Sequence, residues 1–392
     1  MDLLVKHGQK SNLQSVKNLW FKIPKEIRVV LLIFLLWKII LTLFAYIAAT
    51  KLPTSLPNIS HPQSEIDHLL SIWFYWDAKW YYSISTVGYS PNKDLVVFFP
   101  LLPFITRFFA NLINFNIALV GLVLNSIFNL VAVIFIYKLA RLDFDKKTSL
   151  RALIYFLIFP TAIFLLAFYT ESLFLALSIP SLYYARKGNF VKAAIFAMFA
   201  SATRMQGIVL FLPLLTEYLE QRKFKWKKIK LDVLWFGLVP VGLFSYMAYL
   251  KANFGNPILF LEYQKNWDRV FFVSKLLRPG FLLPLFQNPI PVLFKFFLAP
   301  TVLVTIFFTG LGVKALSIRK SYGVYVLVSI LFFISSGTFD SAIRYCLVLV
   351  PGFFVLAKLG EDNPLVENLV IVVFTLFLAL FTGSYVNGYW AN

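Results

Sequence analysis

One acid, Asp77, stands among aromatic residues near the start of segment 76–100, WDAKWYYSISTVGYSPNKDLVVFFP. A carboxylate that aromatic rings partly shelter loses hydration, and such a carboxylate is suited to act as a general base. Tryptophan and tyrosine favour the boundary between lipid and water. We therefore expect Asp77 to abstract a proton at the depth of a lipid head group, with ion pairing to Lys79 or Lys93 as the alternative. The expected sheltering rings are those of Trp76, Trp80, Tyr81 and Tyr82.

The composition of the chain places Asp77 in a membrane protein. Of the 392 residues, 59% are hydrophobic, 18% are aromatic and only 14% are charged, which is too apolar for an ordinary soluble protein. Apolar stretches of about 20 residues, long enough to cross a bilayer, recur between positions 29 and 381. The sequence therefore predicts an all-α polytopic membrane protein with about eleven transmembrane helices.

The basic residues predict how these helices are oriented. The net charge is +19, and Lys and Arg gather in the tail 1–28 and in short loops, as they do on the cytoplasmic side of membranes. A cytoplasmic N-terminus then places Asp77 in a long first outer loop, residues 50–115, on the extracytoplasmic or luminal face. Because topology explains the charge, nucleic acid is not an expected partner. Cys346 is the only cysteine, so an intrachain disulfide is excluded.

Two parts of the first outer loop have the pattern of interfacial helices. Residues 64–86 carry apolar and aromatic side chains at helical spacing between charged ones, which predicts a helix that lies on the membrane. Gly88 then permits a turn. Residues 98–109 form a second apolar stretch that is too short to span the bilayer, and we expect Pro100 and Pro103 to break it.

Several motifs in the chain resemble those of the PIG-V-like mannosyltransferases, membrane enzymes of the GT-C class. WDAKWY at 76–81, GY at 88–89 and FFPLLP at 98–103 are similar to the family signature WDA.WY..IA..GY...FFPLYP. YTESLF at 169–174, TRMQG at 203–207 and RY at 344–345 follow in the family's order. The resemblance is good over residues 76–215 and weak over residues 231–339.

This resemblance implies a GT-C-type helix bundle that transfers a hexose, mannose above all, from a polyprenyl-phosphate carrier to an acceptor hydroxyl on the non-cytoplasmic face. By that analogy Asp77 is the catalytic base of a single displacement that inverts the anomeric carbon. No cofactor is expected beyond the lipid-phosphate sugar donor, and the acceptor is a glycan, a glycolipid or a protein. Membrane lipids are the other expected partners. We expect a catalytic module at 29–260 and a variable C-terminal region at 261–392.

A phosphate leaving group needs cationic partners, and arginine matches phosphate oxygens with two parallel hydrogen bonds. Arg204 and Arg344 each interrupt an apolar stretch near the expected outer surface, where charge usually has a purpose. Snorkelling or a structural salt bridge is the alternative reading of both. Lys79 is a further candidate phosphate ligand and Arg269 a weaker one, whereas Arg107 is expected to be a surface anchor.

Glu171 follows Thr170 at the expected start of a helix, where an acid and a threonine commonly stabilise the helix end. In the alternative reading, Glu171 holds sugar hydroxyls or orients Arg204. Lys38, inside the first apolar stretch, either pairs across the bundle or snorkels. The other candidates for binding the sugar or the acceptor are aromatic and amide residues of the same motifs, namely Trp76, Trp80, Tyr81, Tyr169 and Gln206.

Three further readings are weighed against this one. His61, Glu65, Asp67 and His68 are residue types that bind divalent ions, but their spacing is not specific and a solvated loop explains them, so no metal site is expected. A flippase or transporter of lipid-linked sugar would place charges and broken helices near the bilayer centre, whereas the ionisable candidates other than Lys38 gather toward one face. A structural scaffold would tolerate substitution of Asp77, Arg204 and Arg344.

Overall fold

The computed structural model describes residues 21–54, 68–90, 92–267, 292–336 and 341–389. Every long regular element within these ranges is helical, which confirms the all-α prediction for this part of the chain. The α-helices are α2 (Lys25–Lys51), α3 (His68–Ser71), α4 (Asp77–Val87), α5 (Leu101–Ile113), α6 (Ile117–Ala140), α7 (Lys146–Leu157), α8 (Glu171–Arg186), α9 (Phe190–Thr203), α10 (Phe211–Gln221), α11 (Val241–Phe254), α12 (Leu259–Tyr263), α15 (Val292–Ile318), α16 (Lys320–Ile334), α17 (Ala342–Leu347), α18 (Val350–Asp362) and α19 (Pro364–Val386).

Short 3₁₀ helices connect several of these α-helices. They are η1 (Lys93–Val97), η2 (Ala162–Leu165), η3 (Met205–Leu210), η4 (Trp226–Lys228), η5 (Leu231–Leu238) and η6 (Gln264–Trp267). Three of them, η1, η3 and η6, contribute residues to the cavity described below. A 3₁₀ turn is tighter than an α-helical turn and is common at the ends of α-helices and in the connections between them.

Five helices in the described residues are long and apolar enough to cross a bilayer. They are α2, α6, the continuous stretch Leu231–Phe254, Pro300–Ile318 within α15, and α19. Large apolar side chains point outward from them: Leu36 and Ile40 of α2 are 59% and 65% exposed, and Leu376 of α19 is 65% exposed. Such a surface is unfavourable in water and suits lipid. The chain is therefore an integral multi-pass membrane protein.

Several predicted spans fall on shorter helices. They fall on α7, α8, α9, α10 and α16, which have 12, 16, 14, 11 and 15 residues. A perpendicular crossing needs about 20 residues of helix. The predicted number of about eleven transmembrane helices thus stays a prediction.

The first outer loop differs from the expected pair of interfacial segments. In the described part of residues 64–86 there are two helices instead of one, because Trp76 takes a positive φ of 55° and the chain turns before α4 begins at Asp77. The prolines do not break the second stretch. Pro100 is the N-cap of α5 and Pro103 lies in its first turn, where the missing proline N–H would have no helical acceptor.

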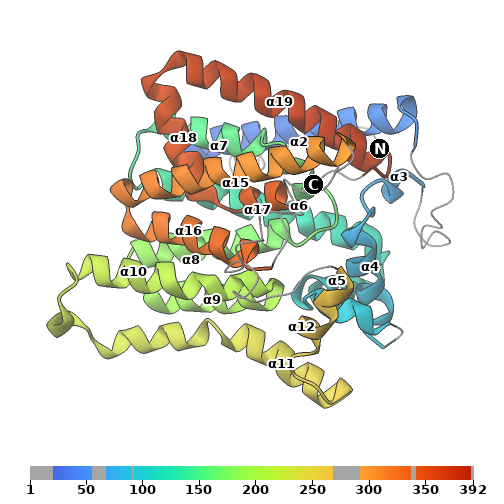
Figure 1. Cartoon of the computed structure of the whole chain (residues 1–392), viewed down its shortest axis with the longest axis horizontal. Coiled ribbons are helices and arrows are strands. Elements are labelled where there is room, and N and C mark those ends of the chain that lie inside the picture. Colours follow the sequence, from blue (N-terminus) through green and yellow to red (C-terminus); the bar gives the residue numbers. More distant parts are fainter. Residues whose placement is uncertain (1–20, 55–67, 91, 268–291, 337–340, 390–392) are drawn as a thin grey trace, which may run out of the picture.

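The long helices run roughly along one direction, and their connections gather at two opposite ends (Figure 1). The turns from α10 to η5, from α15 to α16 and from α18 to α19 lie at one end, on the left in the picture. The helices of the first outer loop, α4 and α5, lie at the opposite end together with α12. α19, near the C-terminus, packs along α2, so the two ends of the described chain share one core.

Arg107 of α5 fixes the end of α4. Its guanidinium donates from Nε to the backbone oxygen of Ser85 at 2.6 Å and from Nη2 to that of Ile84 at 2.9 Å. The last carbonyls of a helix have no partner within the helix, and a cation there also interacts favourably with the helix dipole. Arg107, expected to be a surface anchor, is instead a side-chain cap that holds α4 against α5.

Candidate functional site

Asp77 is the first residue of α4, and a hydrogen bond to Tyr169, which lies two residues before α8, fixes its backbone. Its N–H donates to the hydroxyl of Tyr169 at 3.1 Å, and that hydroxyl donates to the backbone oxygen of Tyr75 at 3.3 Å. A carboxylate in the first turn also lies where the helix dipole favours negative charge. The chain turns at Trp76, and the Asp77 side chain that follows lines a cavity of the protein.

The carboxylate of Asp77 belongs to a chain of four charged side chains. Arg344 donates from Nη1 to Asp77 Oδ2 at 2.9 Å, and its Nε lies 3.4 Å from Glu171 Oε1. Arg204 donates from Nη1 to the same Glu171 oxygen at 2.8 Å. Two carboxylates thus alternate with two guanidiniums. Charges removed from water are stable only when they are paired in this way.

Neither arginine lies in a long helix. Arg204 has extended backbone (φ −154°, ψ 146°) between α9 and η3, and Arg344 lies on the six-residue helix α17. Aromatic rings surround both guanidiniums. Arg344 lies 5.3 Å from the ring centres of Phe164 and Tyr169, and Arg204 lies 5.4 Å from that of Tyr345. These contacts restrict the arginines in addition to the ion pairs.

Glu171 is the most buried member of the charged chain, with 1% of its surface exposed. It begins α8, as predicted, but Thr170 makes no side-chain capping hydrogen bond. The side chain of Glu171 contacts Arg204 and Arg344, while its second oxygen has no hydrogen-bond partner in the described residues. The structure therefore favours the reading in which Glu171 orients the arginines over the reading in which it only stabilises the helix end.

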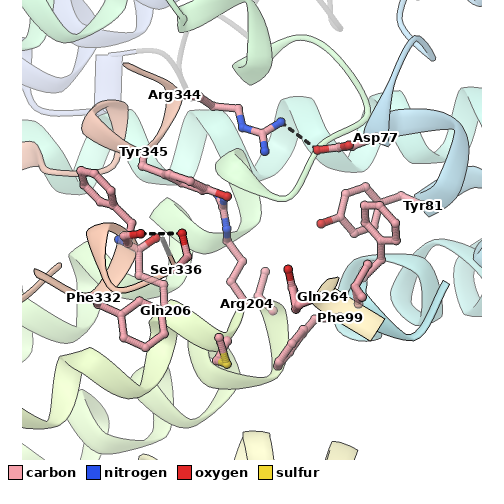
Figure 2. Close-up of a pocket in the computed structure, with 15 residues that line it drawn as sticks. Asp77, Tyr81, Phe99, Arg204, Gln206, Gln264, Phe332, Ser336, Arg344 and Tyr345 are labelled. Atoms are coloured by element: carbon pink, nitrogen blue, oxygen red, sulfur yellow. Dashed lines mark hydrogen bonds and ion pairs between the residues drawn. The ribbon is translucent and has the colours of Figure 1, made fainter. Parts of the chain in front are cut away.

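A cavity of about 140 Å³ opens beside this chain. Figure 2 shows Asp77, Arg204 and Arg344 around it, with the Tyr81 hydroxyl facing the same space. Tyr81 accompanies Asp77 because residues four apart share one face of a helix. The described lining residues are Asp77, Tyr81, Val97, Phe98, Phe99, Thr203, Arg204, Met205, Gln206, Gln264, Phe332, Phe333, Ser336, Arg344 and Tyr345.

One buried polar atom at this cavity has no partner. The amide nitrogen of Gln206 makes no hydrogen bond within the described part of the chain, whereas the Nε atom of Arg344 is ion-paired with Glu171. Buried polar groups are normally paired, so such an atom marks a place where another molecule can supply the partner. Burial raises the pKa of the Tyr81 hydroxyl, which therefore stays protonated and can donate a hydrogen bond.

The structure brings five of the predicted site residues to the cavity: Asp77, Tyr81, Arg204, Gln206 and Arg344. Glu171 and Tyr169 do not line the cavity but contact residues that do: Glu171 pairs with Arg204 and Arg344, and Tyr169 accepts from the N–H of Asp77. Trp76 donates from its indole nitrogen to the backbone oxygen of Tyr389 at 3.1 Å, outside the lining. Lys79 places its ammonium 4.5 Å from the ring centre of Trp80, and neither residue lines this cavity. Asp77 pairs with Arg344 and not with Lys79 or Lys93.

Four polar lining residues were not among the predicted ones: Thr203, Gln264, Ser336 and Tyr345. Thr203 precedes Arg204 in the TRMQG motif. Tyr345 follows Arg344 in the RY pair, so the motif itself could have identified it. Gln264 and Ser336 lie where the resemblance is weak, and their neighbours carry no pattern that singles them out. Only the folded chain places them beside Asp77.

The remaining candidates lie elsewhere. Lys38 donates to the hydroxyl of Ser126 on α6, so it pairs across the bundle. Among the described residues no group of three His, Cys, Asp or Glu side chains could hold a metal ion. His61, Glu65, Asp67 and Arg269 lie outside the described residues, as does the side chain of His68.

Comparison with known proteins identifies a family for this chain. No curated protein matches the chain closely enough to count as a relative. The sequence family described as "Mannosyltransferase (PIG-V)" matches residues 19–232, a stretch that contains Asp77, Glu171 and Arg204. Arg344 lies beyond it. Because the match covers more than half of the 392 residues, the chain belongs to the PIG-V mannosyltransferase family and is a glycosyltransferase of the membrane.

Proposed function

We propose that the protein moves mannose from a polyprenyl-phosphate carrier to an acceptor hydroxyl on the non-cytoplasmic face, with inversion at the anomeric carbon. The observation that carries this proposal is the position of Asp77 and two guanidiniums around one cavity at the end of the molecule formed by the first outer loop. One carboxylate can accept a proton there, and two cations can receive a phosphate.

The displacement balances with these groups. As the acceptor oxygen forms its bond to the anomeric carbon, the Asp77 carboxylate takes the hydroxyl proton, and the bond from the anomeric carbon to the phosphate oxygen breaks. The sugar passes through an oxocarbenium-like state. The products are the mannosylated acceptor and the polyprenyl phosphate, which keeps the bonding electron pair.

Arg204 and Arg344 are the proposed phosphate ligands. A fixed guanidinium near a developing negative charge stabilises the transition state more in a sheltered site than in water. Glu171 lies within 3.4 Å of both guanidiniums and keeps them facing the cavity. A monophosphate donor offers no diphosphate for a cation to bridge, so we propose that these arginines take the role that a divalent ion has with nucleotide sugars.

The test compares wild type with Asp77→Asn in detergent, where transfer can be measured but translocation has no meaning. With polyprenyl-phosphate mannose and a panel of acceptors, we expect Asp77→Asn to lower the transfer rate by about 10²- to 10⁴-fold. Asp362→Asn, an exposed acid in α18, is the matched control and should leave the rate unchanged.

Three results would contradict parts of the proposal. Undiminished transfer by Asp77→Asn would remove this residue as the base. A product with the donor's anomeric configuration would exclude a single displacement. Transfer from a nucleotide sugar but not from the lipid-linked donor would exclude the donor class.

A further inference from the structure

A second cavity, of about 220 Å³, lies beside the first and is not used by the proposed mechanism. Its described lining consists of Trp80, Asn92, Asp94, Leu95 and Asn266. The presence of one large aromatic ring among short polar side chains distinguishes it from the first cavity, which two guanidiniums dominate.

Three short elements each contribute to both cavities. α4 supplies Tyr81 to the first and Trp80 to the second, and η1 supplies Val97 to the first and Asp94 to the second. η6 supplies Gln264 to the first and Asn266 to the second. The same three elements thus border both spaces, and Trp80 lies three residues after Asp77 on α4, so that the two side chains are neighbours on the helix surface. A molecule that occupies the second cavity can therefore reach toward Asp77 along α4.

The polar groups of the second cavity are held in fixed positions. Asn266 donates from its amide to Asp94 Oδ1 at 2.8 Å, which ties η6 to η1. The side-chain oxygen of Asn92 accepts from the N–H of Asp94 at 2.8 Å and so fixes the start of η1. Preorganised groups of this kind lower the entropic cost of binding.

The chemistry of this lining fits a neutral saccharide. A sugar ring offers an apolar face that can lie on an indole ring, and its hydroxyls can donate to a carboxylate and accept from an amide. The lining contains no Lys or Arg among the described residues, and Asp94 would repel a phosphate. Lys79 lies over the Trp80 ring at 4.5 Å but does not line the cavity.

We propose that the second cavity is the acceptor subsite and that the acceptor is a saccharide. Its sugar ring lies on Trp80 and its hydroxyls bond to Asp94 and Asn266, so that one further hydroxyl reaches Asp77. This inference rests on the proposed function for the role of the bound sugar, but not for the binding itself.

Binding is tested first, without catalysis. Saturation-transfer NMR on the full-length protein in detergent measures the affinity for methyl α-D-mannopyranoside and methyl α-D-glucopyranoside, with myo-inositol phosphate as the anionic comparison. Trp80→Leu, Asp94→Asn and Asn266→Ala should each weaken glycoside binding roughly tenfold, since a large aromatic contact or a hydrogen bond contributes on that scale. Asn253→Ala, an exposed asparagine of α11 outside both cavities, is the control for Asn266→Ala.

Kinetics then connect the cavity to the reaction. The three variants should raise the KM for a saccharide acceptor roughly tenfold and leave the KM for the lipid-linked donor unchanged. Asp94→Asn keeps an oxygen that can accept from Asn266, so a folded protein with weak acceptor binding is expected even if Trp80→Leu unfolds.

Failure of the subsite and failure of the proposed function are distinguishable. If the wild type binds glycosides through these residues but transfers no mannose, the proposed function is wrong and the subsite stands. If the wild type transfers mannose while every variant keeps the wild-type acceptor KM, the subsite is wrong and the proposed function stands. Preferential binding of the inositol phosphate, or an equal rise in the donor KM, would also overturn the subsite.

Discussion

At the scale of single residues, Glu171 has an unusual position because one of its oxygens serves both arginines of the site. Arg204 and Arg344 carry like charges, and Glu171 Oε1 lies 2.8 Å from one and 3.4 Å from the other. Without its negative charge the two guanidiniums would repel each other and leave their present directions. Because Glu171 contacts both arginines but does not line the cavity, we propose that it is a positioning residue.

Glu171→Gln is expected to lower kcat by tenfold or more without raising the donor KM, because the positive charge that attracts phosphate remains while its orientation is lost. Stability should also fall, by about 3 kcal/mol, since buried charge is left uncompensated. Steady-state kinetics and thermal unfolding measure both effects. Glu262→Gln, an exposed acid of α12, is the control. An unchanged kcat would show that Glu171 does not position the arginines.

The sequence predicted the charged members of the site better than the aromatic ones. An acid or an arginine in an apolar chain must be paired, so residue type alone was enough to single out Asp77, Arg204 and Arg344. The side on which a ring of α4 falls depends on where that helix starts. With α4 starting at Asp77, Tyr81 shares its face and Trp80 turns toward the second cavity. Lys79, two residues after Asp77, lines neither cavity.

At the scale of elements, the close approach of η3 to α9 sets the position of Arg204 and Gln206. A Cβ atom added at Gly207 would lie 2.3 Å from the backbone oxygen of Ala200 and 2.4 Å from the nitrogen of Ser201. Backbone atoms cannot give way as a flexible side chain can. Any larger residue at position 207 would therefore push η3 away from α9 and shift one wall of the cavity.

Gly207→Ala should destabilise the protein by about 1–3 kcal/mol and weaken transfer, because overpacking moves Arg204 and Gln206 together. Gly237→Ala is the matched control, since no described atom lies within 4 Å of its added Cβ and only a small change in unfolding temperature is expected. Thermal unfolding in detergent and the rate of mannose transfer measure the two effects. Equal behaviour of both variants would show that the approach of η3 to α9 does not position the site.

The break before α4 could not be read from the sequence. The apolar residues of 64–86 have helical spacing throughout, and this pattern cannot reveal that one residue, Trp76, takes a positive φ. Trp76 is held at this angle by distant contacts, among them its hydrogen bond to the backbone of Tyr389. Tyr389 is 313 positions away in the sequence, so this contact exists only in the folded chain. Local pattern therefore predicted the helices, and tertiary contacts decided where one of them is interrupted.

At the scale of the whole molecule, the basic loops and the candidate site lie at opposite ends. The connection from α10 to η5 carries Arg222, Lys223, Lys225, Lys227 and Lys228 and lies at the end opposite α4 and α5 (Figure 1). Basic loops are retained in the cytoplasm. Together with the apolar surface of the long helices, this separation supports a site on the extracytoplasmic or luminal side.

Cysteine labelling tests this orientation. Cys346 is fully buried, so the native background should be low. Lys93→Cys and Lys227→Cys place thiols at exposed positions near opposite ends of the molecule. In intact cells or sealed vesicles of native orientation, a membrane-impermeant maleimide should label position 93 at once and position 227 only after permeabilisation. The reverse result would place the site on the cytoplasmic side.

The sequence predicted the membrane class and the apolar segments, because the hydropathy of a segment depends only on the residues in that segment. It could not predict how many segments cross fully. Helices of 11 to 16 residues such as α8 and α10 are apolar in sequence yet shorter than a perpendicular crossing needs, and their depth depends on the neighbours that enclose them.

The ion pair between Asp77 and Arg344 joins residues that are 267 positions apart, and Arg344 lies outside the stretch that matches the family. During synthesis, Asp77 emerges from the ribosome long before α17 exists. Its counter-ion arrives only when the last quarter of the polypeptide has been inserted. A product truncated after residue 232 would thus retain the stretch that matches the family yet leave Asp77 without the arginine that neutralises it.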